Sequence, residues 1–255
     1  MIDWRPVLAG LALAITVMAS APAAPAADRP GAVTPPAPID RILPPSRSGG
    51  SWSARVVAPV AARARPGTGR VLTGLGVATT WSHHPQSLLV LDTRESPDGR
   101  QWLKVLLPIR PVGAAGWIPR DRAVLRKSNL WIEIRKQNRW LYAFRNGRRI
   151  GRFRIVIGAP GTPTPAGLAA VYERNRQPDP KEFLGPWSLS LTALSRTLKN
   201  YGGGPGRIAM HGRGGDSYAD PLGSAASHGC IRIPNPGIRW LARIAAPGTP
   251  VAIRN

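Results

Sequence analysis

A single cysteine, Cys230, and a histidine nineteen positions before it, His211, are the two side chains best suited to covalent chemistry. A thiol with its ordinary pKa of about 8.5 is mostly protonated near neutral pH, and a neighbouring imidazole can take the proton and leave a thiolate. The second ring nitrogen then needs an acceptor that fixes the tautomer, and a backbone carbonyl suffices. The pair predicts attack on a carbonyl, with Cys230 as nucleophile and His211 as general base.

The sequence around the pair suits this chemistry. Gly229 has no Cβ, so the backbone before Cys230 can turn sharply and present N–H groups to a developing oxyanion. Between Gly212 and Ser227 lies a loop rich in Gly, Ser and Asp. We expect this loop to fold back and bring His211 beside Cys230.

The side chains near the pair could also have purely structural roles. His228 could be a packed core residue, and Arg232 could simply pair with an acid such as Asp216 or Asp220. A zinc site built on the two histidines and the cysteine lacks a C-x-x-C or H-E-x-x-H spacing. We therefore expect neither a metal nor another cofactor.

The motif His211-Gly212, followed by Ser227-His228-Gly229-Cys230-Ile231-Arg232, resembles the catalytic domain of the L,D-transpeptidases (YkuD type). Four more segments are similar to family segments in the same order. They are the opening hairpin, a Thr-Pro-Thr-Pro-x-Gly stretch, a segment lining the substrate side and the closing strand, at 132–145, 161–167, 185–187 and 248–251.

This resemblance implies roles for individual residues. Cys230 would be the nucleophile and His211 the proton acceptor and donor, with the carbonyl of Gly212 orienting the imidazole. Supporting residues would be Ser227, with His228 and Gly229 shaping the oxyanion region and Arg232 supporting the site or meeting a substrate carboxylate.

Two positions depart from the family pattern. Arg213 stands where Thr often follows the His-Gly pair, and Asn235-Pro236-Gly237 lacks the acidic residue of an Asn-x-Asp motif. We expect the missing acid to affect the start of the following helix more than the chemistry, because Asp commonly caps a helix.

The function implied by the resemblance is an L,D-transpeptidase, a cysteine acyltransferase that cross-links peptidoglycan stem peptides through a thioester. Water in place of the acceptor amine would make an L,D-carboxypeptidase, and a noncatalytic cell-wall-binding protein is a further alternative. An NlpC-type cysteine peptidase fails on order, because its Cys precedes its His and no histidine follows Cys230.

The formal net charge of +22 indicates an anionic partner. Nucleic acid is disfavoured, since no zinc-finger spacing or RNP motif is present and the basic residues form no long block. Anionic cell-wall polymers fit an exported protein better, and an Arg-rich source proteome could also contribute to the charge.

Export is predicted by the N-terminus. Arg5 precedes an apolar run of about 12 residues from Val7 to Met18, too short for the ~20 that span a bilayer, and small residues follow it. We expect a signal peptide over residues 1–26, an extracytoplasmic location on the cell-wall or periplasmic side, and membrane contact only if the segment is uncleaved. A Pro-rich linker is expected over 27–50.

The fold expected to position the site is mostly β. Within residues 127–255, a β-sandwich-like domain of YkuD type with few helices, alternation predicts strands at 130–135, 140–145 and 152–157. The Asn146-Gly147 pair predicts a two-residue hairpin. A short strand at 207–210, a helix at 236–244 and a strand at 251–254 follow. Residues 51–126 resemble a small SH3-like β-barrel, with apolar runs at 55–60, 88–92, 102–107 and 116–118.

Overall fold

A computed structural model describes residues 41–200 and 203–255, and this part of the chain is mostly β-strand, as expected. The signal peptide expected over residues 1–26 lies outside the described residues, as does the linker up to residue 40. Within the described ranges, no helix has both the length and the hydropathy needed to cross a membrane.

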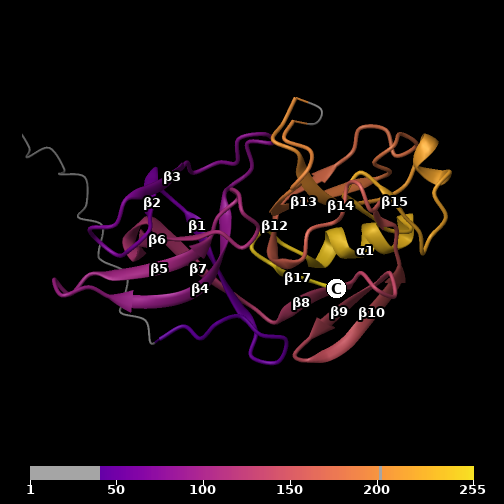
Figure 1. The fold of residues 1–255 in the computed structure, drawn as a ribbon. Coiled ribbons are helices and arrows are strands. Elements are labelled where there is room, and N and C mark those ends of the chain that lie inside the picture. Colours follow the sequence, from indigo (N-terminus) through magenta and orange to yellow (C-terminus); the bar gives the residue numbers. More distant parts are fainter. Residues whose placement is uncertain (1–40, 201–202) are drawn as a thin grey trace, which may run out of the picture. The chain divides into compact units, whose positions relative to one another are not determined.

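Seven strands between residues 51 and 128 form an antiparallel sheet in the order β3-β2-β6-β5-β4-β1-β7 (Figure 1). They are β1 (Ser51–Val56), β2 (Val60–Arg63), β3 (Val71–Leu75), β4 (Ser87–Glu95), β5 (Gln101–Leu106), β6 (Ala115–Pro119) and β7 (Ala123–Ser128). The run at 55–60, expected as one strand, is divided between β1 and β2. The SH3-like character of this sheet stays a prediction.

The prediction that the Pro-rich linker extends from residue 27 to residue 50 is wrong for its last residues. Ile42 is 4% exposed, belongs to the hydrophobic core of the seven-stranded sheet, and donates its N–H to Thr93 Oγ1 at 3.0 Å. Burial of this side chain holds the segment against the sheet. At the other end, β7 continues to Ser128, across the boundary expected between residues 126 and 127.

A mixed eight-stranded sheet follows, in the order β10-β9-β8-β17-β12-β13-β14-β16 (Figure 1). Its neighbours are antiparallel except for β17 beside β8 and β16 beside β14, which are parallel. Two short strands, β11 and β15, pair separately. The strands are β8 (Leu130–Arg135), β9 (Trp140–Arg145), β10 (Arg148–Arg154), β11 (Ile157–Gly158), β12 (Gly167–Arg176), β13 (Trp187–Leu194), β14 (Arg207–His211), β15 (Ala225–Ser227), β16 (Ile231–Arg232) and β17 (Pro250–Arg254).

The helix α1 (Asn235–Ile244) covers part of this sheet. Its apolar stripe, Ile238, Leu241 and Ala242, is buried with Leu and Ile side chains of the strands in one core. Each fully buried side chain of Leu or Ile size contributes about 1.5–3 kcal/mol. Two 3-10 helices, η1 (Arg120–Arg122) and η2 (Gly215–Tyr218), complete the helical elements of the described residues.

The hairpin expected at Asn146-Gly147 is present between β9 and β10, and both residues have positive φ angles, as a type I′ turn requires. The strand expected over 152–157 is wrong in its extent. β10 begins at Arg148 and ends at Arg154, and Val156 then exchanges two backbone hydrogen bonds with Arg232. The chain changes partner here: after β10 its backbone pairs with Arg232 of β16, and β11 then pairs with β15.

Candidate active site

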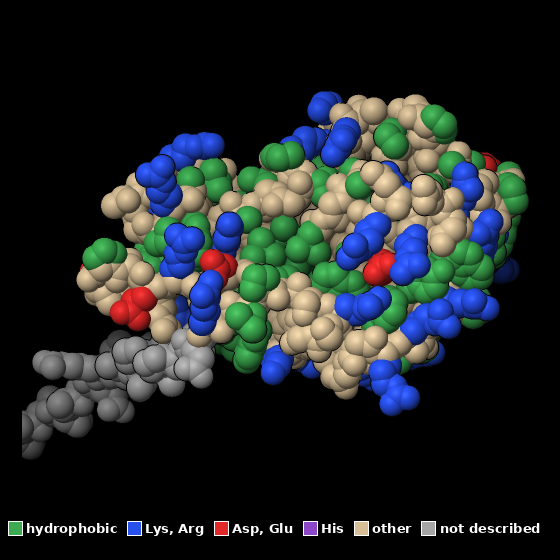
Figure 2. All heavy atoms as spheres, turned by 60° about the horizontal axis from the view of Figure 1, so that its bottom comes forward, with side chains coloured by type: hydrophobic (Ala, Val, Ile, Leu, Met, Phe, Trp, Pro, Cys, Tyr) green, Lys and Arg blue, Asp and Glu red, His purple; other side chains and the backbone are tan. Residues whose placement is uncertain are grey.

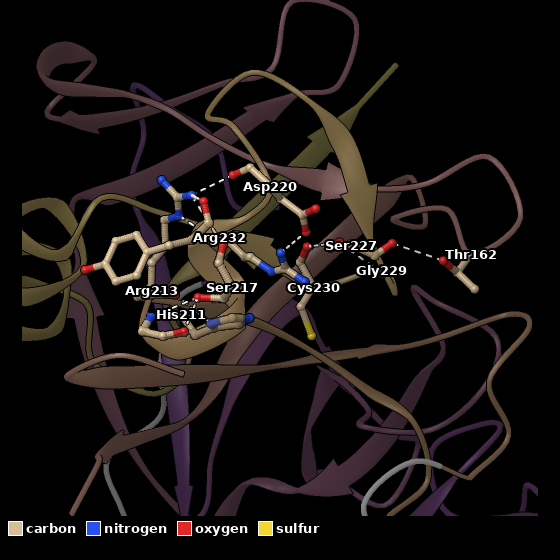
Figure 3. Close-up of polar contacts among 12 residues, drawn as sticks. Thr162, His211, Arg213, Ser217, Asp220, Ser227, Gly229, Cys230 and Arg232 are labelled. Carbon is tan, nitrogen blue, oxygen red and sulfur yellow. Dashed lines mark hydrogen bonds and ion pairs between the residues drawn. The ribbon is translucent and has the colours of Figure 1, made fainter. Parts of the chain in front are cut away.

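β14 and β16 bring His211 and Cys230 to the same face of the sheet. Their parallel register pairs His211 with Arg232 and Met210 with Ile231. Paired residues on neighbouring strands share a face, as do alternate residues along one strand. Because Met210 and Ile231 belong to the hydrophobic core, the side chains of His211, Arg232 and Cys230 point to the opposite face (Figure 3).

These side chains line one cavity of about 210 Å³. Its wall is apolar at Phe183, Leu184 and Ile208 and basic at Arg207, Arg232 and His228. Among the described residues that line it, none is acidic. The cavity therefore combines a thiol, an imidazole and positive charge.

The imidazole of His211 is held in one tautomer. The side chain is buried, and its Nδ1 lies 2.8 Å from the carbonyl oxygen of Gly212. A carbonyl only accepts, so Nδ1 carries the hydrogen and Nε2 presents its lone pair. Nε2 is buried and forms no hydrogen bond with any described residue. That nitrogen is the free acceptor that a general base needs.

The electrostatics of the pair keep both groups neutral. Burial, assisted by the charge of Arg232, lowers the pKa of His211 from 6.5 to about 4, although the hydrogen bond to Gly212 acts in the other direction. Burial also raises the pKa of the Cys230 thiol, although the backbone of Ala209 and the charge of Arg232 act in the other direction. Near pH 7 the pair is a thiol and an imidazole, and a thiolate forms when the proton passes to Nε2.

The turn that presents Cys230 is fixed by hydroxyl groups. Ser227 Oγ donates to the Cys230 carbonyl at 2.6 Å and accepts from the Gly229 N–H at 3.1 Å. Thr164 Oγ1 donates to the Gly229 carbonyl at 2.8 Å, and Thr162 Oγ1 donates to the Ser227 carbonyl at 3.0 Å. Gly229 has φ +114°, which side-chain-bearing residues rarely adopt. Its N–H holds the turn and does not face a substrate.

Arg232 pairs with Asp220, the second of the two acids considered from the sequence; Asp216 is exposed. The Arg232 side chain is 4% exposed, and its guanidinium lies 4.9 Å from the centre of the Phe183 ring. The ring of Phe183 in turn lies 5.9 Å from that of His211. Arg232 thus links the acidic loop residue to the wall of the cavity beside the base.

Arg213, which departs from the family pattern after the His-Gly pair, has a structural role. Arg213 is buried and donates to the carbonyl oxygens of Ser217, Tyr218 and Asp220, so it holds the loop after His211 in shape. Asn235 bonds both the N–H and the carbonyl of Arg213, at 2.7 and 2.9 Å. Its amide therefore braces this loop.

The acidic residue that is missing from the first turn of α1 has no room in this fold. At Gly237 a Cβ would lie 2.7 Å from the ring of Phe153. The helix starts after Pro234 with no side-chain cap, and Pro236 in its first turn needs no N–H partner. The start of the helix therefore has no side-chain cap, and Ile238 and Leu241 after it are buried in the core.

His228 is exposed and lines the cavity mouth, so its interpretation as a core residue is wrong. Thr162, Thr164 and Phe183 are site residues to which the sequence assigned no role. The two threonines lie in the Thr-Pro-Thr-Pro stretch, whose hydroxyls were the available signal. Phe183 stands before the Gly185-Pro186-Trp187 segment and carries no signal of its own.

Replacing Asp220 by asparagine is expected to lower the free energy of unfolding by about 2 kcal/mol, because the buried Arg232 charge loses its ionic partner. Denaturant unfolding at pH 7 measures the change. The matched control is Asp216→Asn on the same loop, which should change stability by less than about 0.5 kcal/mol. Equal effects of the two substitutions would show that the ion pair contributes nothing.

The low pKa of His211 predicts a stability loss in acid. Between pH 6.5 and 4 the unfolded chain binds a proton that the folded chain does not, so stability falls as the pH falls through this window. From pH 7 to 4.5 the loss should be about 2 kcal/mol larger in the native protein than in a His211→Gln variant. Identical pH dependence of unfolding in both proteins would contradict the assigned burial.

Known proteins resemble the C-terminal half of the chain. Residues 129–253 match the family model of the L,D-transpeptidase catalytic domain, YkuD. The YkuD protein of Bacillus licheniformis is 32% identical over 122 residues, which are 48% of this chain and 64% of that protein. The chain thus spans less than two thirds of that relative's length.

Two solved structures show similarity of lower identity. An L,D-transpeptidase of Enterococcus faecium aligns over 51% of this chain and 55% of its own, with 20% identity and a TM-score of 0.35. An L,D-transpeptidase of Mycobacterium smegmatis aligns over 79% and 99%, with 14% identity and a TM-score of 0.40. On the family match and the Bacillus licheniformis relative, residues 129–253 are similar to the L,D-transpeptidase catalytic domains of the YkuD family.

Proposed function

We propose that this protein is an L,D-transpeptidase that cross-links peptidoglycan stem peptides through a thioester on Cys230. One observation carries the proposal: the thiol lines the same cavity as the buried, unpartnered Nε2 of His211. A nucleophile and a base of fixed tautomer on one wall are the parts that acyl transfer needs. The substrate is a stem tetrapeptide whose penultimate residue is L-centred and whose last residue is D-alanine.

The reaction balances with these two side chains. The Cys230 thiol passes its proton to Nε2 of His211 as the sulfur attacks the carbonyl carbon. The C–N bond to D-alanine breaks, and the amine leaves with the proton from His211. An amine of a second stem then attacks the thioester, His211 takes its proton, and the thiol is regenerated. Water in that step gives the carboxypeptidase product.

The lining of the cavity supports an anionic substrate. Arg207 and Arg232 line it without an acidic side chain among the described residues; Asp220 already pairs with Arg232, so the favourable potential for the terminal carboxylate of a stem peptide comes mainly from Arg207. We place this reaction outside the cytoplasm, on the cell-wall or periplasmic side, on the strength of the export signal expected at residues 1–26. The substrate occurs there.

The test is incubation of the purified protein with disaccharide tetrapeptides, with products read by mass spectrometry. Loss of D-alanine with dimer formation is the expected result. Loss of D-alanine with addition of water would replace transpeptidation by the carboxypeptidase alternative. An unchanged substrate, with the protein still retained on cell-wall material, would favour the noncatalytic wall-binding alternative.

A further inference from the structure

The outer face of β8, β9 and β10 carries arginine and aromatic side chains in adjacent rows. Leu141 and Ala143 of β9 point into the core, so the alternate residues of this strand point outward. The arginine face consists of Arg47, Arg135, Arg149, Arg152, Arg154 and Arg254 around Trp140, Tyr142 and Phe144. Five of its six arginines are exposed; Arg154 is half-buried.

Register places the arginines of β10 beside the rings of β9. Arg149 pairs with Phe144, Arg152 with Tyr142, and Arg154 with Trp140. Neighbouring rings on β9 are close to each other: the ring centroids of Tyr142 and Trp140 are 6.5 Å apart. The arginines of β10 therefore form one row, and the aromatic rings of β9 form a second row beside it.

The guanidinium groups are stacked on these rings. The guanidinium carbon lies 4.7 Å from the Phe144 centroid for Arg47, 4.9 Å from Tyr142 for Arg135, and 5.2 Å from Trp140 for Arg152. Stacking on a ring restricts a guanidinium while leaving its N–H edge open, and that edge matches the two oxygens of a carboxylate. The face thus presents several oriented donors.

The positive charge of the face is almost uncompensated. Glu133 is the only acidic residue in the sequence of β8, β9, β10 and β17. It is buried, and its oxygens already lie 2.6 Å from Arg135 and 3.8 Å from Arg254. Figure 2, in which the lower side of Figure 1 comes forward, shows far more basic than acidic side chains over this part of the molecule.

The face also contains a hollow of about 660 Å³. Arg47, Arg135 and Arg254 border it, and the buried Glu133 lies at its floor. The hollow does not include Cys230 or His211, which line the separate catalytic cavity. Anionic groups can therefore bind here while a stem reacts elsewhere.

A bilayer and a nucleic acid fit this face less well. Of the large hydrophobic side chains that the described residues expose, only Ile150 lies on β8, β9 or β10, so the face has little to insert into lipid. Base stacking needs open aromatic rings. Here Phe144 is buried, and guanidinium groups cover Trp140 and Tyr142.

We propose that the arginine face is a second, noncatalytic binding site for peptidoglycan, which it holds by the carboxylates of stem peptides that are not in the catalytic cavity. The choice of peptidoglycan as the partner rests on the proposed function; the preference for an extended polymer of carboxylates rests on the face itself. The site keeps the enzyme on the polymer between turnovers.

The test compares two triple variants of the full chain. Arg47→Gln/Arg149→Gln/Arg152→Gln removes three exposed charges from the arginine face, and Arg65→Gln/Arg70→Gln/Arg126→Gln removes three exposed charges from the region of the seven-stranded sheet. Binding to purified sacculi stripped of attached polymers is measured by co-sedimentation over a range of salt concentrations. The first variant should bind about tenfold more weakly, with a shallower salt dependence, and the second should bind almost as tightly as the native protein.

Three results would overturn the proposal. The first is an equal loss of sacculus binding in both triple variants. The second and third are tighter binding of the native protein to anionic lipid vesicles, or to duplex DNA, than to stripped sacculi. Turnover of a soluble tetrapeptide separates this proposal from the proposed function, because both variants should keep it. If the native protein binds sacculi through the arginine face but leaves the soluble peptide intact, the proposed enzyme activity is contradicted and the proposed binding site is supported. A version with lysine at positions 47, 149 and 152 should restore part of the binding, since charge returns without the stacked geometry.

Discussion

Substituting Cys230 by alanine is expected to reduce release of D-alanine from a stem tetrapeptide at least about a thousandfold, to the background of the assay. No other thiol exists in the chain to replace the nucleophile. The fold should survive, because the side chain is only half-buried and contributes little to the core. Steady-state turnover, with the circular dichroism spectrum as a check on folding, measures both expectations.

The conservative variant Cys230→Ser is the matched control for shape. Its hydroxyl has nearly the volume of the thiol but is a poorer nucleophile beside a neutral imidazole, so it should also be inactive while it still binds substrate. Native turnover in Cys230→Ala would mean that the reaction uses another group, and the site would lose its nucleophile.

Replacing Arg213 by alanine is expected to lower the free energy of unfolding by about 3 kcal/mol and turnover by about tenfold or more. The change leaves three carbonyl oxygens of the loop from Ser217 to Asp220 without their donor, and buried acceptors left unpaired are costly. The loop then no longer holds Asp220 against Arg232. Arg213 acts as a positioning residue in this account, because it reaches the chemistry only through that loop.

Two measurements separate positioning from general destabilisation. Hydrogen exchange should accelerate mainly at residues 213–220 in Arg213→Ala, and turnover should fall more than substrate affinity. Arg196→Ala, at an exposed arginine, is the control and should change neither. Uniform acceleration of exchange along the chain would contradict a local role for Arg213.

The turn before Cys230 and the hairpin of β9 and β10 could be predicted from the sequence because local signals specify them. Strand alternation identified β8 and β9 with their observed bounds, and Asn146-Gly147 specified the turn. The Ser-His-Gly-Cys motif indicated the turn at Gly229 because only glycine readily adopts its φ angle. Each of these features depends on residues close together in the chain.

The long strands β12 and β13 were not predicted. β12 carries Glu173 and Arg174 in its second half, and its first half is a run of small apolar residues without alternation. β13 is buried on both faces along most of its length, which hides strand periodicity. Tertiary pairing with β17 and β14 forms these strands, and a local pattern does not record it.

The hydrogen bonds that hold the loop after His211 could not be predicted from the sequence either. Arg213 looked like a departure from a pattern and Asn235, 22 positions later, had no assigned role, yet Asn235 forms three hydrogen bonds with the loop, two of them to the backbone of Arg213. The choice of Asp220 over Asp216 as the partner of Arg232 depends on how η2 turns the loop. Such long-range pairings follow from the folded loop, since both acids are equally plausible from spacing alone.

Intact-protein mass spectrometry of a rapidly quenched reaction with a stem tetrapeptide tests the central claim most directly. The account predicts a transient adduct with the mass of the tetrapeptide less D-alanine, mapped to the peptide that contains Cys230, and no adduct in Cys230→Ala. An adduct on any other residue, or product formation without an adduct on this thiol, would contradict the account.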